Sequence, residues 1–138
     1  MSDKLKIVAF VCENHAMSAI RAASIAGESL PESVRIIEIP CTGRLETPQM
    51  LEAIGGGADG VAVIGCLEEN CYHDIGSMLA RGRVNRIKDI LKDISMEPER
   101  VEMINAASVS GAMLMMKLRQ FESRVASLPV LSLKGAIQ

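Results

Sequence analysis

Four short apolar runs, rich in β-branched residues and separated by segments with helical spacing, constrain the fold of this chain most. The runs cover residues 6–11, 34–39, 60–64 and about 101–105. Strands that alternate with helices are typical of a parallel sheet covered by helices on both faces. We therefore expect an α/β fold with a four-stranded, doubly wound parallel sheet of the flavodoxin or Rossmann type. The expected domain is single and spans residues 1–138, with a mobile tail over 129–138.

The segments between the runs carry helical signals. Alanines recur at helical spacing over roughly 15–29, and Asn14 stands before them as a candidate N-cap. A later segment carries apolar residues in a 3-4-3 spacing, at Val84, Ile87, Leu91 and Ile94. Because βαβ crossovers are right-handed, the loops that follow all the strands should lie at one edge of the sheet.

All the cysteines of the chain fall in loops that follow predicted strands. The first three runs each end at or just before a cysteine: Cys12, Cys41 and Cys66. The remaining cysteine, Cys71, stands five positions after Cys66. The carboxyl edge of an open parallel sheet is where ligands bind in α/β proteins. We therefore expect the four thiols to gather at this edge and to form one site.

Four thiolates in one site favour a metal centre. A Cys-x₄-Cys pair with two further cysteines is compatible with a [2Fe–2S] cluster. Zinc also accepts four cysteines, although structural zinc sites usually show two closely spaced pairs. His15 and His73 stand close in sequence to Cys12 and Cys71, which makes them candidate additional ligands.

A thiol nucleophile is a further alternative. It would use Cys12 or Cys66, with His73 as a candidate base for Cys12, but no orienting acid stands out in the sequence. Arg81 and Arg83 are expected to be solvated at the start of a helix. Beside a cluster bound by thiolates, their positive charge would offset its negative charge.

The composition argues against several classes of partner. The chain has 138 residues, a formal net charge of −2, one Tyr, two Phe and no Trp, so we expect no nucleic acid partner. Its apolar stretches are far shorter than the roughly 18–20 residues that span a bilayer, so we expect no membrane insertion. The amino terminus lacks a signal-peptide layout, which predicts a cytoplasmic protein with reduced thiols.

Five segments, read in order, form one pattern: Ala9-Phe-Val-Cys12, Cys41-Thr-Gly-Arg44, Gly57-Ala-Asp-Gly-Val61, Gly65-Cys66-x₄-Cys71 and Arg83-Val84. This pattern resembles the delta-subunit family of methyl-viologen-reducing hydrogenase. Members of that family are small iron–sulfur proteins that carry electrons between a hydrogenase or other donor and the flavin-bearing subunit of heterodisulfide reductase. The family often has further cysteines in the first loop, where this chain has Val11 and His15.

The resemblance implies a set of ligands and a role. Cys12, Cys41, Cys66 and Cys71 would hold a [2Fe–2S] cluster, with His15 as a candidate additional or substitute ligand. The chain would be a subunit of a cytoplasmic oxidoreductase complex, with no catalysis of its own and no small-molecule substrate. The alternative is a non-redox interaction or scaffold subunit whose cysteine site is degenerate or holds zinc.

Overall fold

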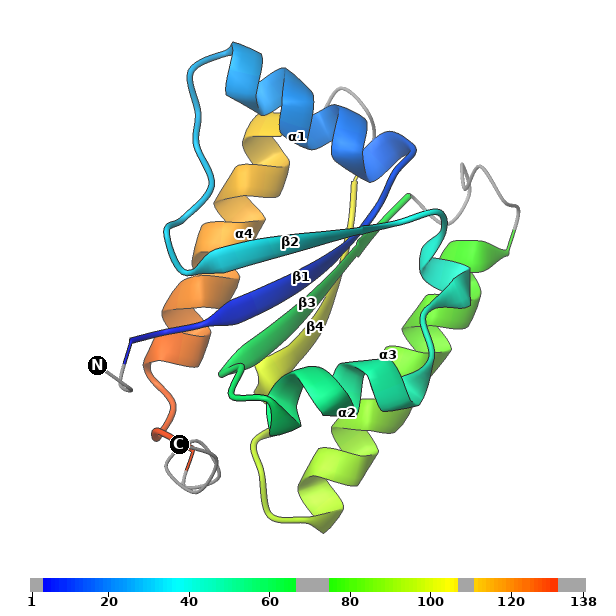
Figure 1. The fold of residues 1–138 in the computed structure, drawn as a ribbon, viewed down its shortest axis with the longest axis vertical. Coiled ribbons are helices and arrows are strands. Elements are labelled where there is room, and N and C mark those ends of the chain that lie inside the picture. Colours follow the sequence, from blue (N-terminus) through cyan, green and yellow to red (C-terminus); the bar gives the residue numbers. More distant parts are fainter. Residues whose placement is uncertain (1–3, 67–74, 107–110, 132–138) are drawn as a thin grey trace.

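The computed structural model describes residues 4–66, 75–106 and 111–131. Its strands form one parallel sheet in the order β2-β1-β3-β4, as Figure 1 shows. The strands are β1 (Ile7–Cys12), β2 (Val34–Ile39), β3 (Gly60–Gly65) and β4 (Val101–Asn105). Their positions and their parallel pairing confirm the predicted fold class.

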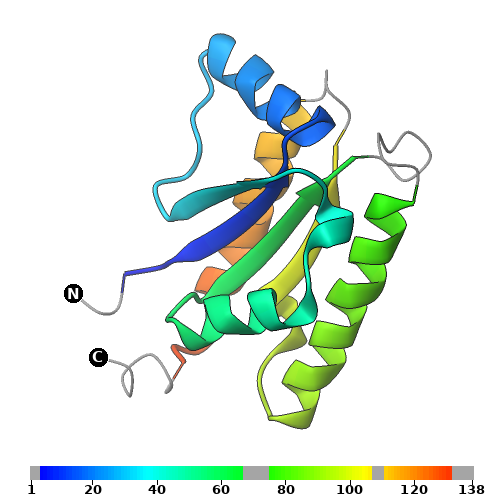
Figure 2. The ribbon, with the colours of Figure 1, turned by 45° about the vertical axis from the view of Figure 1, so that its right-hand side comes forward.

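Helices cover both faces of the sheet, as expected of a doubly wound fold (Figures 1 and 2). One face carries α1 (His15–Ile25) and α4 (Gly111–Ala126), and the other carries α2 (Thr47–Gly55) and α3 (Gly76–Asp93). Alternate residues of the central strands point into the two cores, so that Ala9 and Val11 face α1 and α4 while Phe10 faces α2 and α3.

The alanine-rich helix is shorter than its spacing predicted. It ends at Ile25 because Ala26 forms the C-cap and Gly27 takes a φ of 92°, a conformation that favours glycine after a helix. The helix also packs very closely against α4. A Cβ atom at Gly111 would lie 2.6 Å from the carbonyl oxygen of Ala19, so only glycine fits this crossing.

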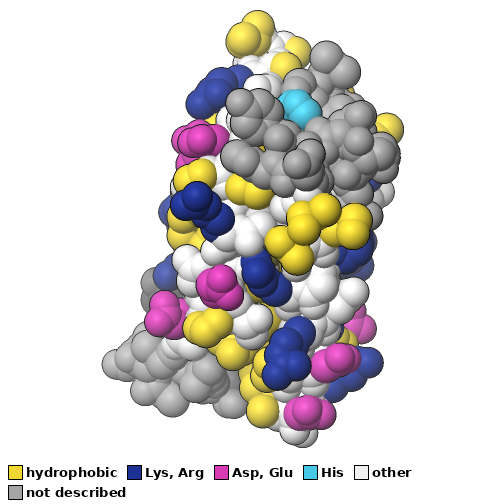
Figure 3. Space-filling model, turned by 90° about the vertical axis from the view of Figure 1, so that its right-hand side faces the viewer, with side chains coloured by type: hydrophobic (Ala, Val, Ile, Leu, Met, Phe, Trp, Pro, Cys, Tyr) yellow, Lys and Arg dark blue, Asp and Glu magenta, His cyan; other side chains and the backbone are white. Residues whose placement is uncertain are grey.

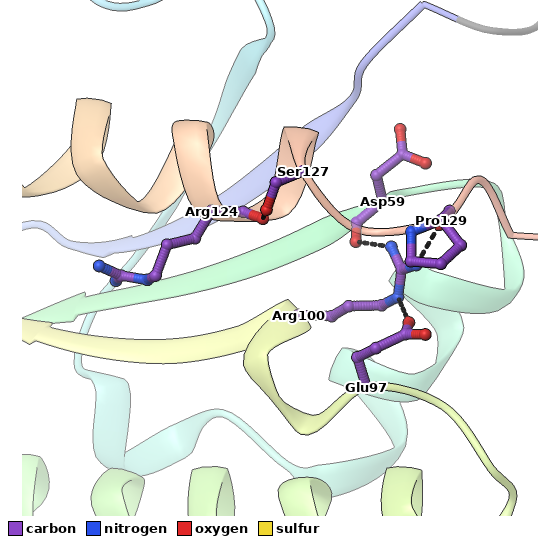
Figure 4. Close-up of polar contacts among 6 residues, drawn as sticks. All are labelled: Asp59, Glu97, Arg100, Arg124, Ser127 and Pro129. Atoms are coloured by element: carbon purple, nitrogen blue, oxygen red, sulfur yellow. Dashed lines mark hydrogen bonds and ion pairs between the residues drawn. The ribbon is translucent and has the colours of Figure 1, made fainter.

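At the amino-terminal edge of the sheet, the buried side chain of Arg100 forms hydrogen bonds to three separate positions of the chain (Figure 4). Arg100 is 1% exposed; its Nε donates to Glu97 Oε1 at 2.7 Å, and its Nη1 donates to the carbonyl oxygen of Asp59 at 2.9 Å. Its Nη2 donates to the carbonyl oxygen of Pro129. This last contact anchors the chain after α4, and Leu131 is buried in the core under α2 and α3. Of the tail that the sequence predicts to be mobile, residues 132–138 lie outside the described residues.

Within the described ranges, no helix combines the length and the hydropathy that crossing a bilayer requires.

Candidate functional site

Two of the predicted site residues lie together at the carboxyl edge of the sheet. Strands β1 and β3 are neighbours, with Val11 opposite Ile64, so the cysteines that follow extend from adjacent strand ends. The Sγ atoms of Cys12 and Cys66 are 3.8 Å apart, and each side chain is only 1% exposed. The fold therefore brings together two thiols that are 54 residues apart in the sequence.

Cys41 follows β2, the strand on the other side of β1. It is buried and caps a short 3₁₀ helix, η1 (Thr42–Arg44), where its Sγ accepts the backbone N–H of Gly43 at 3.3 Å. In the described part of the chain, no three His, Cys, Asp or Glu side chains form a group that could hold a metal. Neither Cys41 nor His15 therefore completes such a group with Cys12 and Cys66. Cys71 and His73 lie outside the described residues.

The separation of the paired thiols suits a metal ion. Two sulfurs bound to one tetrahedral ion at about 2.3 Å lie about 3.8 Å apart, and the observed separation is 3.8 Å. Thiolates are the ligands that iron–sulfur clusters and zinc share. The pair of Cys12 and Cys66 therefore fits one half of a four-thiolate site without rearrangement.

Asn14 is at the N-cap position of α1 but does not cap the helix with its side chain. Its Nδ2 instead donates to Cys12 Sγ at 3.7 Å and to the carbonyl oxygen of Pro40 at 3.3 Å. The two hydrogens of one amide group can serve these two acceptors. Asn14 therefore connects the end of β1 to the turn that carries Cys41, which corrects the expectation of a simple cap.

The thiol of Cys12 is strongly disposed to keep its proton. Burial raises the pKa of Cys12 to about 11, and the neighbouring Cys66 thiol acts in the same direction. The backbone and side-chain amides of Asn14 favour the thiolate and oppose this rise. A group with this pKa is a poor nucleophile at neutral pH, because the thiolate is the reactive form. A metal ion bound at this sulfur would take the place of the proton and so stabilise the thiolate form of Cys12.

Close packing holds the segments that carry Cys41 and Cys66 in place. A Cβ atom at Gly43 would lie 2.8 Å from Gly76 Cα, and one at Gly65 would lie 2.9 Å from Thr42 Oγ1. These contacts press η1 against the start of α3 and against the end of β3. Glycine at positions 43 and 65 is therefore a requirement of the site.

The carbonyl oxygen of Cys66 accepts two side-chain hydrogen bonds. Ser77 Oγ donates at 2.8 Å from the first turn of α3, and Asn105 Nδ2 donates at 2.6 Å from the end of β4. Neither residue was among those predicted from the sequence. Asn105 carried the same signal as the cysteines, since it is a polar residue at the carboxyl end of a predicted strand.

The two arginines at the start of α3 differ from each other. Arg81 is exposed, as expected, although it donates to Asn105 Oδ1. Arg83 is half-buried and its Nη1 donates to the carbonyl oxygens of Gly43 and Leu45, the latter at 3.2 Å. The expectation of a solvated Arg83 was therefore wrong: its side chain fastens the Cys41 turn to α3.

The chain is similar to known proteins over most of its length. The model of the delta-subunit family of methyl-viologen-reducing hydrogenase matches residues 7–129. The vhu iron-sulfur subunit of the F420-non-reducing hydrogenase of Methanopyrus kandleri is 31% identical over 93% of this chain and 97% of its own length. The vhc iron-sulfur subunit of the corresponding hydrogenase of Methanococcus voltae is 36% identical over 70% of this chain and 67% of its own.

A larger protein carries a similar segment. One subunit of the ferredoxin:CoB-CoM heterodisulfide reductase of Methanosarcina mazei is 30% identical to this chain over 76% of it, but that segment is only 13% of the relative's length. The family match covers all the strands and helices described above. This chain therefore belongs to the delta-subunit family of methyl-viologen-reducing hydrogenase.

Proposed function

We propose that this chain is an electron-transfer subunit that holds a [2Fe–2S] cluster through Cys12, Cys41, Cys66 and Cys71. It relays electrons between a donor, such as a hydrogenase, and a heterodisulfide-reductase-like or other flavin-containing partner. The observation that carries this proposal is the buried pair of Cys12 and Cys66, whose sulfurs are separated by the distance that one tetrahedral metal ion requires. The names of the relatives support it, since they describe an iron-sulfur subunit of a hydrogenase and one component of a heterodisulfide reductase.

The residues of the site have separate tasks in this proposal. When bound, the cluster would supply one-electron redox chemistry. The cysteines would bind the cluster as thiolates, which would make loading depend on pH. The backbone N–H of Gly43 and the side-chain amide of Asn14 donate to Cys41 Sγ and Cys12 Sγ, respectively, and so stabilise negative charge on these sulfurs.

The surface beside the site suits contact with a partner. Three large apolar side chains are exposed at the start of α3: Ile75 (55%), Met78 (56%) and Leu79 (44%). Figure 3 shows hydrophobic side chains gathered on this face of the molecule. Contiguous apolar groups on a surface are typical of sites where proteins meet. The start of α3 also carries Ser77, which bonds to Cys66, so such a contact would lie close to the thiols.

Two observations favour a second candidate, a non-redox subunit with a degenerate or zinc-filled site. His15 stands in the first loop, where the family often has a further cysteine, and among the described residues no three His, Cys, Asp or Glu side chains form a group that could hold a metal. A zinc ion would fit the same 3.8 Å separation.

Anaerobic purification followed by metal and sulfide analysis separates these candidates. We expect two iron atoms and two acid-labile sulfides per chain, for a [2Fe–2S] cluster, and an electron paramagnetic resonance signal after reduction. Cys12→Ser and Cys66→Ser should each lower the iron content. Stoichiometric zinc without sulfide would establish the second candidate, and a metal-free protein would refute a resident cluster.

A further inference from the structure

Strand β4 forms an open edge of the sheet next to the candidate site. In the described residues β4 pairs with β3 alone, and the N–H of Ala106 donates to the carbonyl oxygen of Gly65. Backbone groups in a parallel strand alternate between its two sides, so Ile104 and Ala106 face β3 while Met103 and Asn105 face outward. The outward N–H and C=O groups are in position to pair with a further strand.

A groove runs along this edge between α3 and α4. Its volume is about 330 Å³, and β4 contributes Glu102, Met103, Ile104 and Asn105 to its lining. The helices supply its sides, with Arg81 from α3 and with Lys117 and Arg124 from α4. Figures 1 and 2 show α3 and α4 on opposite faces of the sheet, with β4 at the end of the strand order. An extended segment laid against β4 would therefore be held on both sides.

The charge of the groove is opposite in sign to that of the whole chain. Three cations, Arg81, Lys117 and Arg124, face one carboxylate, Glu102, whereas the formal net charge of the chain is −2. Glu102 pairs with Arg124 at 2.5 Å. The remaining excess of positive charge would attract a segment with carboxylates.

The groove also connects to the thiol pair. Asn105 receives a hydrogen bond from Arg81 on Oδ1 and donates one from Nδ2 to the carbonyl oxygen of Cys66 at 2.6 Å. A segment bound to the backbone of Asn105 would therefore lie close to the Cys66 backbone, with only the Asn105 side chain between them.

We propose that the edge of β4 is an interaction surface that binds an extended, acidic segment of a partner protein as a fifth strand. Backbone pairing with Met103 and Asn105 supplies the affinity, while the net positive formal charge of the groove lining, to which Lys117 contributes, favours carboxylates. This surface is separate from the metal ligands, so the proposal holds whether the site carries a cluster, zinc or no metal.

The test uses the purified full chain and a fluorescent peptide of alternating glutamate and valine. We expect binding that weakens with salt, together with slower amide hydrogen exchange at Met103 and Asn105. Lys117→Glu should weaken binding about tenfold, because it reverses a charge at the groove. Lys92→Glu is the matched control: Lys92 is exposed near the end of α3, does not line the groove, and should leave affinity unchanged.

A second variant tests the strand pairing itself. Met103→Pro removes an outward N–H without removing a bond to β3, and proline is tolerated on edge strands. This variant should lose binding of the peptide but keep a cooperative thermal unfolding transition. If the variant does not fold, the affinity of Lys117→Glu and the hydrogen-exchange pattern along β4 test the proposal instead. Equal binding of a lysine–valine peptide would overturn the proposal, as would equal binding of a single-stranded oligonucleotide or unchanged exchange along β4.

Discussion

The side-chain amide of Asn14 donates to the thiol of Cys12, with Nδ2 3.7 Å from Sγ, while its helix begins without a side-chain cap. The same Nδ2 is 3.3 Å from the carbonyl oxygen of Pro40. One side chain thus spans the ends of β1 and β2 and directs a donor at a candidate ligand. A donor aimed at a ligand sulfur stabilises the more negative, reduced form of a cluster.

Asn14→Leu should therefore lower the midpoint potential of the cluster-loaded protein, because it removes the donor to Cys12 Sγ without adding charge. Asn14→Asp should lower the potential further, since it places a negative charge there. Potentiometric titration monitored by electron paramagnetic resonance measures both shifts. In the metal-free protein, Asn14→Leu should cost about 1 kcal/mol of unfolding free energy for the lost bonds.

Asn85→Leu is the matched control for these variants, since Asn85 is exposed on α3. It should leave the potential and the stability unchanged. An unaltered potential in both Asn14 variants, at full iron content, would show that the amide does not act on the cluster.

Gly43 and Gly82 should respond in opposite directions to the same substitution. A Cβ atom at Gly43 would lie 2.8 Å from Gly76 Cα and would force η1 away from α3. Gly43→Ala should therefore lower the unfolding free energy by about 1–3 kcal/mol. Gly82 lies inside α3, and a Cβ atom there would meet nothing within 4 Å beyond its chain neighbours and the nearby backbone of its own helix, so Gly82→Ala should raise stability by about 0.5–1 kcal/mol. Urea unfolding of the two variants checks both signs, and equal effects would contradict the close packing at Gly43.

Arg83 should stabilise the Cys41 turn through its hydrogen bonds to the carbonyl oxygens of Gly43 and Leu45. Arg83→Met keeps much of the apolar stem but removes both donors, and should lower the unfolding free energy by about 1–3 kcal/mol. Arg86→Met, at an exposed position of the same helix, is the control and should change little. Similar losses in the two variants would mean that the guanidinium contacts contribute nothing specific.

The strands were the most predictable part of this fold. Val34–Ile39 and Val101–Asn105 are short, β-branched runs bounded by turn residues, and the structure has them at the predicted positions. The meeting of Cys12 and Cys66 followed from parallel topology, because parallel strands end at one edge. The spacing of residues along the chain was therefore sufficient to predict the strands and the meeting of these two cysteines.

The roles of Asn14 and Arg83 depend on contacts between distant segments. Asn14 has the same local pattern whether its amide caps a helix or reaches Pro40, 26 residues away. Arg83 has the polar neighbours of a solvated residue, yet it contacts carbonyl oxygens 38 and 40 residues earlier. The first contact depends on how the ends of β1 and β2 meet and the second on how η1 packs against α3, so single-sequence patterns could not predict them.

The metal-free thiol of Cys12 should react slowly. Burial raises its pKa to about 11, so little thiolate is present at neutral pH, and the side chain is 1% exposed. Iodoacetamide should therefore label Cys12 slowly in the folded, metal-free protein and rapidly in urea. Mass spectrometry of the labelled peptides measures both rates. Rapid labelling of the folded protein at Cys12 would instead support the thiol enzyme considered from the sequence.

The same raised pKa predicts how the stability of the metal-free protein depends on pH. The pKa of Cys12 is about 11 in the folded state against 9.0 for an ordinary cysteine. Between these values the unfolded chain has lost a proton that the folded chain retains, so raising the pH favours unfolding. The contribution of the Cys12 thiol to the unfolding free energy is fully present below pH 9.0 and is lost as the pH approaches 11.

Cys12→Ala isolates this contribution. Lys88, whose pKa burial lowers, gives a slope of opposite sign in the alkaline range, but it is common to both proteins and cancels in the comparison. The unfolding free energy of the unsubstituted protein should therefore fall more steeply from about pH 8 to pH 11 than that of Cys12→Ala. Urea titrations under reducing, metal-free conditions measure the two slopes. Parallel slopes would mean that Cys12 has an ordinary pKa and that the thiol pair is open to water in solution.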